Sequence, residues 1–108
     1  MVVEIRTYQT KPGLRDCFAD FITHKSGPVQ RSKGIQLLGP FVALDNENAV
    51  ICLRGFRNLR ERHRLRGLFY EDPEWKGVLK AQALEVLDSY KVVLAETRTG
   101  TFKFDDYL

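Results

Sequence analysis

Three side chains that could bind a ligand or move a proton stand at every second position near the start of the sequence. Glu4, Arg6 and Tyr8 have the spacing i, i+2, i+4, which places them on one face of a β-strand. A carboxylate, a guanidinium and a phenol together could hold a polar or anionic ligand, or take part in acid–base chemistry. They could equally form a buried ion pair at a subunit interface, with Tyr8 as packing. We expect them on the sheet face that carries no helices.

Arg62 is a further candidate, because its position in a predicted helix is unusual for an arginine. At about 100° per residue, it falls on the same arc as Leu65 and Phe69. Its guanidinium should be at least half buried and then needs a partner, either a protein carboxylate or carbonyl, or the carboxylate or phosphate of a ligand. His63 falls at the edge of this arc. Trp75 could line an enclosed pocket or belong to the core.

Other kinds of chemistry find little support among the residue types. We interpret Cys17 and Cys52 as buried small hydrophobic residues and not as nucleophiles. His24 and His63 show no metal-ligand spacing with each other or with carboxylates, and neither stands where an axial haem ligand would be expected. We therefore predict no metal site and no cofactor.

The elements that must position these residues follow from periodicity and from turn residues. The fold class is α+β, because the order β-α-β-β-α-β is that of a ferredoxin-like domain. A turn over 45–48 should make a hairpin of the second and third strands, with a bulge at Gly39-Pro40, and Ser26-Gly27-Pro28 should end the first helix. The predicted strands are 2–9, 34–44, 49–57 and 89–97, and the predicted helices are 13–25, 58–70 and a segment that begins at Asp72-Pro73.

The later strands carry apolar residues on both faces. Ile51 and Leu53 point one way, whereas Val50, Cys52 and Phe56 point the other way. Helices cover only one face of a sheet in this fold, so the other face needs a cover that the chain itself does not supply. We predict a homodimer in which two sheets pack face to face into a dimeric α/β-barrel. The domain spans 1–97, and the apolar tail 98–108 could pack on the partner subunit.

Length and charge exclude several classes of protein. The 108 residues suit one domain. The 17 Lys and Arg against 14 Asp and Glu leave a net charge of +3, too mild for a nucleic-acid-binding protein without a concentrated basic face. The arginine-rich stretch 54–66 could be a solvated helix face or an anion-binding face. No apolar run approaches the roughly 20 residues of a membrane span, and no signal-peptide pattern opens the sequence. We expect no membrane insertion and a cytoplasmic location.

A set of short motifs resembles the NIPSNAP family over residues 2–97. The motifs are EIRTY (4–8) followed by KPG (11–13), LGPF (38–41), Glu61-Arg62 and DPEW (72–75). The resemblance implies a dimeric α+β barrel. It names no reaction, because the small stand-alone members mostly have no assigned activity. The chain departs from the family pattern at Leu53-Arg54, where an aromatic residue is usual.

Two main functions follow from these observations, with a structural partner protein as a third, and whether the protein is an enzyme stays open. The first is a small homodimeric binding or accessory protein of NIPSNAP type. The alternative is a cofactor-independent oxygenase or isomerase that acts on a small aromatic or polyketide-like compound. A cavity of about 300 Å³ or more with Tyr8, Arg62 or His63 on its wall would favour an enzyme or a protein that binds a small ligand. An interior filled by aromatic and aliphatic side chains would favour an accessory or structural role.

Overall fold

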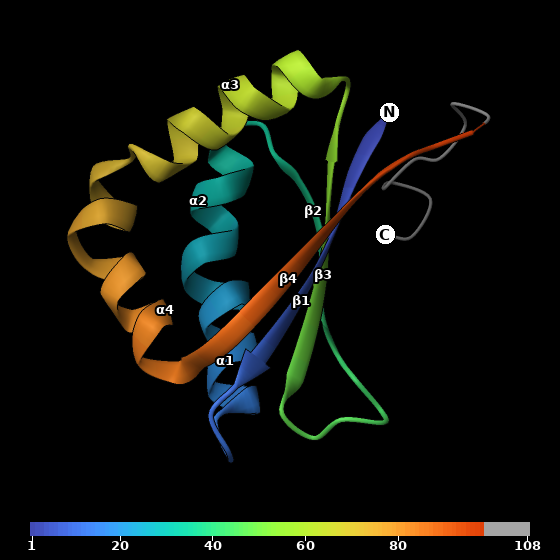
Figure 1. Cartoon of the computed structure of the whole chain (residues 1–108). Coiled ribbons are helices and arrows are strands. Elements are labelled where there is room, and N and C mark those ends of the chain that lie inside the picture. Colours follow the sequence, from blue (N-terminus) through green and yellow to red (C-terminus); the bar gives the residue numbers. More distant parts are fainter. Residues whose placement is uncertain (99–108) are drawn as a thin grey trace.

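A four-stranded antiparallel sheet forms one layer of the computed structural model, which describes residues 1–98 (Figure 1). The spatial order of the strands is β2-β3-β1-β4, so β1 lies inside the sheet and pairs with both β3 and β4. The strands are β1 (Val2–Thr10), β2 (Gln36–Val42), β3 (Ala49–Phe56) and β4 (Leu87–Glu96). The four predicted strands and the hairpin are confirmed.

The helices form the second layer, and all of them lie on the same side of the sheet (Figure 1). Two start signals act as the sequence predicts. The Asn58 side chain accepts a hydrogen bond from the Glu61 N–H at 2.8 Å, and the Asp72 carboxylate accepts one from the Glu74 N–H at 2.9 Å, so both residues cap helices. The helical segments are α1 (Arg15–Phe21), η1 (Ile22–Ser26), α2 (Gly27–Ser32), α3 (Leu59–Tyr70), η2 (Trp75–Leu79) and α4 (Lys80–Val86).

The first helix corrects our prediction, because Ser26-Gly27-Pro28 does not end it. The segment η1 is a short π-helix whose wider turn is closed by the Gly27 N–H donating to the Ile22 carbonyl. Pro28, which has no N–H to donate, then stands in the first turn of α2, where an N–H is not needed. The helical path therefore continues from residue 15 to residue 32.

The strand β2 bends where the sequence predicts a bulge. Its register against β3 shifts between Leu38 and Phe41. Gly39 takes a φ of +112° and the Gly39–Pro40 peptide bond is cis. A Cβ at Gly39 would lie 3.0 Å from the Ile51 carbonyl oxygen, so glycine suits both the conformation and the space.

The side of the sheet away from the helices is apolar, as predicted. The register places these side chains on one face: Val3, Ile5, Leu38, Phe41, Ile51, Leu53, Val93 and Ala95. Val3 and Leu38 are buried and pack with Met1 and Leu53. Ile5, Phe41 and Val93 stay 38%, 45% and 52% exposed. We call this surface the helix-free face.

Two further predictions concern membrane insertion and the C-terminal tail. Among residues 1–98, no helix is long and apolar enough to cross a membrane. The predicted tail lies outside the described residues from position 99 onward.

Candidate functional site

Glu4, Arg6 and Tyr8 share one face of β1, but that face is the one covered by helices. The Glu4 carboxylate is bound by Arg62 of α3, with 2.7 Å between Oε2 and Nε. The Tyr8 ring packs edge-on against Phe18 of α1, with 5.0 Å between ring centroids. Our expectation of the helix-free face is therefore wrong. A period of two shows which residues share a face but not which face the helices cover.

Four arginines surround the Glu4 carboxylate, which is completely buried. Its Oε1 lies 2.6 Å from one guanidinium nitrogen and 3.2 Å from another, and its Oε2 lies 2.7 Å and 3.7 Å from two more. Four positive charges therefore face one negative charge in a region of low dielectric constant. These four residues, here called the arginine cluster, are Arg54, Arg6, Arg62 and Arg66.

The arginine cluster keeps Glu4 ionised. Burial alone would raise the pKa of the Glu4 carboxyl, but the hydrogen bond and charge of Arg54, the charge of Arg6 and the hydrogen bond of Arg62 together lower it to about 2. Arg62 is confirmed as a mostly buried side chain (18% exposed) with a protein carboxylate as partner. This carboxylate belongs to the first strand, 58 positions earlier in the chain.

Two tyrosine hydroxyls accept hydrogen bonds from the arginine cluster. Arg6 Nε donates to the Tyr8 hydroxyl at 2.7 Å, and Arg54 Nη2 donates to the Tyr70 hydroxyl at 3.4 Å. Burial raises the pKa of Tyr8, and Arg6 offsets only part of that effect. At Tyr70, burial acts in the same direction, but the charges of Arg54 and Arg6, with the hydrogen bond from Arg54, outweigh it and lower the pKa.

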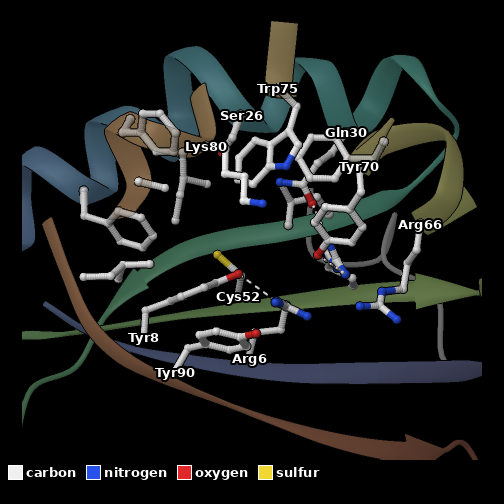
Figure 2. Close-up of a pocket in the computed structure, with 18 of the residues that line it drawn as sticks. Arg6, Tyr8, Ser26, Gln30, Cys52, Arg66, Tyr70, Trp75, Lys80 and Tyr90 are labelled. Carbon is white, nitrogen blue, oxygen red and sulfur yellow. Dashed lines mark hydrogen bonds between the residues drawn. The ribbon is translucent and has the colours of Figure 1, made fainter. Parts of the chain in front are cut away.

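A cavity of about 510 Å³ lies between the sheet and the helices, which is within the usual size of a small-molecule site. Tyr8 and Arg6 line it from β1, Trp75 from η2, and Arg66 and Tyr70 from α3. Figure 2 shows Tyr8 and Tyr90 on the sheet side, with Trp75 pointing toward them from the helical side. The cavity passes the size criterion that the sequence analysis sets for a ligand.

The two ends of the cavity differ in chemistry. Arg66 and Tyr70 lie at one end (Figure 2), where Arg54 and Gln30 also line the wall. The rest of the wall is largely apolar, and Leu84 is its exposed apolar member. The apolar lining residues are Phe18, Phe21, Ile22, Leu37, Ala83, Leu84 and Leu87. A ligand that fits both ends would carry an apolar body and a negatively charged group.

The structure separates the remaining predicted residues. Trp75 both lines the cavity and packs on Phe69, with 4.7 Å between ring centroids. His63 is exposed and does not line the cavity, so its predicted place at the edge of the buried arc is wrong. Cys52 is buried in the cavity wall, where burial raises the pKa of its thiol to about 12. Cys17 is exposed, contrary to expectation.

Tyr70 was not predicted as a site residue, and Arg54 and Arg66 were considered only as members of the arginine-rich stretch 54–66. Arg54 is the direct partner of Glu4 in the register of β1 and β3, and this pairing requires the tertiary fold. Arg66 had a usable signal, because it stands four positions after Arg62 and so on the same side of a helix. Among residues 1–98, no three His, Cys, Asp or Glu side chains come together as metal ligands.

The fold and the cavity define the class of this protein as a ferredoxin-like α+β domain with a ligand-sized space between sheet and helices. The family model NIPSNAP matches residues 3–97. The chain therefore belongs to the NIPSNAP family.

Solved structures agree with this assignment. A NIPSNAP family protein from Agrobacterium tumefaciens is 21% identical, with a TM-score of 0.83 over 94% of this chain and 98% of that chain. An uncharacterized NIPSNAP domain protein from Burkholderia xenovorans is 19% identical, with a TM-score of 0.82 over 90% of this chain and 94% of that one.

The same fold extends beyond the family. An antibiotic biosynthesis monooxygenase is 13% identical, with a TM-score of 0.65 over 90% of this chain and 98% of that chain. At this identity the likeness concerns the fold alone. No curated protein matches the chain.

Proposed function

We propose that this protein is a homodimeric binding protein for a small amphipathic anion. The observation that carries the proposal is the cavity of about 510 Å³ with three members of the arginine cluster, Arg6, Arg54 and Arg66, on its wall. The apolar body of the ligand would lie among the aromatic side chains, and its anionic group would face Arg66 and Arg54. The free thiols Cys17 and Cys52 suit a reducing compartment, so we place this activity in the cytoplasm.

The charge balance supports an anion over a neutral ligand. Arg54 uses three nitrogens on Glu4, Gln30 and Tyr70. The Arg66 Nε is buried and makes no hydrogen bond within residues 1–98, and it lies 3.7 Å from the nearest Glu4 oxygen. The Arg66 side chain is 36% exposed and pairs with Glu4 only at that distance, and a buried N–H without a hydrogen-bond partner costs free energy. A ligand carboxylate would supply that partner.

Binding is tested with two probes that differ only in charge, phenylacetate and phenylacetamide. We expect phenylacetate to raise the melting temperature, because a ligand of the folded state stabilises it, and phenylacetamide to do so much less. Titration calorimetry should show that Arg66→Met weakens phenylacetate binding by about tenfold or more. Arg64→Met is the matched control, because Arg64 lies on the same helix, is 59% exposed and pairs with Glu61 away from the cavity wall. Equal affinity for acid and amide would contradict the proposal.

The proposed homodimer explains the helix-free face. Eight apolar side chains lie there with no element of residues 1–98 above them. Burial of such a face against its own copy is favourable at about 25 cal/mol per Å². Because the cavity lies on the opposite side of the sheet, each subunit would keep its own ligand site.

A cofactor-independent oxygenase or isomerase is the second candidate. The observation that favours it is the Arg6–Tyr8 hydrogen bond of 2.7 Å on the cavity wall, since a positioned phenol can give a proton to a reacting group. Oxygen uptake in the presence of small quinols tests this candidate. A rate that depends on the protein and falls in Tyr8→Phe would support it, and a rate equal to that of buffer would count against it.

A further inference from the structure

The hydroxyl groups of Tyr8 and Tyr70 have a common feature that the binding proposal does not use. Each accepts a hydrogen bond from a guanidinium, Tyr8 from Arg6 and Tyr70 from Arg54. A guanidinium only donates, so these bonds occupy a lone pair of each hydroxyl and leave its proton available. Both side chains line the cavity. Two phenolic donors are therefore available to an oxygen atom inside it.

The positive charge at this end is only partly balanced by the protein, because Glu4 supplies one negative charge to four guanidiniums. Glu71 is the only carboxylate among the described lining residues, and it is 75% exposed and bound by Lys76 at 2.9 Å. Lys80 adds a further positive charge to the wall. Cys52 stays a neutral thiol, because burial raises its pKa to about 12. An oxyanion in the cavity would thus meet donors and positive charge with no buried carboxylate in the wall.

The pKa of Tyr70 shows how the surrounding arginines affect a phenol at this end of the cavity. Burial would raise its pKa, yet the charges of Arg54, Arg6 and Arg66 and the hydrogen bond from Arg54 lower it. The Arg66 guanidinium carbon lies 5.3 Å from the centre of the Tyr70 ring. At Tyr8 burial has the larger effect and raises the pKa, so this hydroxyl is the weaker acid of the two.

From this geometry we infer that the arginine end of the cavity is an oxyanion site that binds weakly acidic phenols or enols in their ionised form. The inference rests on the proposed function and names the ligand class of the same cavity. On ionisation the O–H bond of the ligand breaks, its electron pair stays on the oxygen and the proton leaves to solvent. The oxyanion then accepts hydrogen bonds from the Tyr8 and Tyr70 hydroxyls and faces the Arg66 guanidinium. No oxidant or cofactor enters this step.

The test uses para-nitrophenol, whose ionisation is visible as a change in absorbance. We expect its titration midpoint in the presence of saturating wild-type protein to fall by at least about one pH unit, which equals a tenfold preference for the anion. Arg66→Met should reverse most of this shift, and Arg64→Met should leave it unchanged. Tyr70→Phe, which removes only the hydroxyl, should reduce the shift and serves as a second variant. A bound midpoint equal to that of free para-nitrophenol would overturn the inference.

A second probe separates this inference from the proposed function. The carboxylate para-nitrobenzoate is already ionised at neutral pH, so its binding tests only whether the cavity takes an anion. If it binds while the para-nitrophenol midpoint does not move, the oxyanion site is wrong and the binding protein stands. If neither probe binds, both proposals fail. The neutral ether para-nitroanisole should bind more weakly than para-nitrophenol, and equal binding would also overturn the inference.

Discussion

Glu4 holds the charged interior of this protein together at the scale of single residues. It is one carboxylate with two oxygens, and four guanidiniums lie within 3.7 Å of them. The arrangement joins β1, β3 and α3 through side chains. Because Arg6 and Arg54 are themselves almost fully buried, the loss of their shared anion would leave unpaired charge in the interior.

The first prediction concerns the replacement of that anion. Glu4→Gln keeps the shape of the side chain but removes its charge, and we expect the free energy of unfolding to fall by about 3–5 kcal/mol. Denaturant unfolding followed by circular dichroism measures the change. The control is Glu61→Gln, which removes a partner of Arg64 at the surface and should have a much smaller effect. Similar losses of stability in both variants would show that the buried Glu4 contributes no more than the surface pair.

The second prediction concerns acid. The pKa of Glu4 is about 2 in the folded state against an ordinary 4.5, so the unfolded chain takes up this proton first as the pH falls. The stabilisation is complete above about pH 4.5 and is lost progressively toward pH 2, by up to about 3 kcal/mol. Glu4→Gln lacks this contribution. The stability difference between wild type and variant, measured by denaturant unfolding, should shrink over that range, and a constant difference would contradict the assignment.

At the scale of elements, the helical path from α1 to α2 depends on how closely its backbone packs at Gly27. A Cβ at this position would lie 2.5 Å from the Ile22 carbonyl oxygen, closer than such atoms approach. Ser26, one residue earlier, lines the cavity. The π-helical turn therefore brings the chain past Pro28 and also shapes one part of the site.

Two glycines allow a matched third prediction. Gly27→Ala should lower the free energy of unfolding by about 1–3 kcal/mol, because the helix must shift to admit the methyl group. Gly67→Ala should raise it by about 0.5–1 kcal/mol, since Gly67 lies inside α3 with nothing within 4 Å of an added Cβ. Thermal and denaturant unfolding give both values. Opposite signs are the expected result, and a stabilised Gly27→Ala would refute the close approach.

At the scale of the whole molecule, the sheet has two covered surfaces in our proposal, one covered by its own helices and the other by a second copy. The helices bury Val50, Cys52 and Phe56, whereas the helix-free face leaves Ile5, Phe41 and Val93 partly exposed. An apolar patch of this kind on an antiparallel sheet is typical of an interaction surface.

The fourth prediction tests the association. We expect a dimer in sedimentation velocity at micromolar concentration, and Ile5→Lys should weaken it by at least about 100-fold, because a lysine charge would be buried without a partner. Leu59→Lys is the control, since Leu59 is exposed on α3, which lies on the other side of the sheet from the helix-free face. A wild-type monomer, or an equal effect of both variants, would contradict the dimer.

Local patterns in the amino-acid sequence were enough for the four strands, the caps at Asn58 and Asp72, the burial of Arg62 and the family resemblance. Each of these depends on residues close together in the chain, where periodicity and turn chemistry act directly. The helix across Pro28 was missed, because the π-helical turn that accommodates it has no comparable local signal. The exposure of His63 and Cys17 was also missed. Helical periodicity shows which side of a helix faces the core, but not how much of that side the neighbouring elements cover.

Tertiary packing alone placed Glu4, Arg6 and Tyr8 under the helices. It also brought Arg54 and Arg66 to the Glu4 carboxylate and to the phenols beside it. Strand alternation is symmetric between the two faces of a sheet, and only the path of the connecting helices breaks that symmetry. Three of the four arginines on Glu4, namely Arg54, Arg62 and Arg66, come from positions 50 or more residues away, so no local rule could join them. The cavity exists for the same reason, since its walls are brought together from five separate segments of the chain.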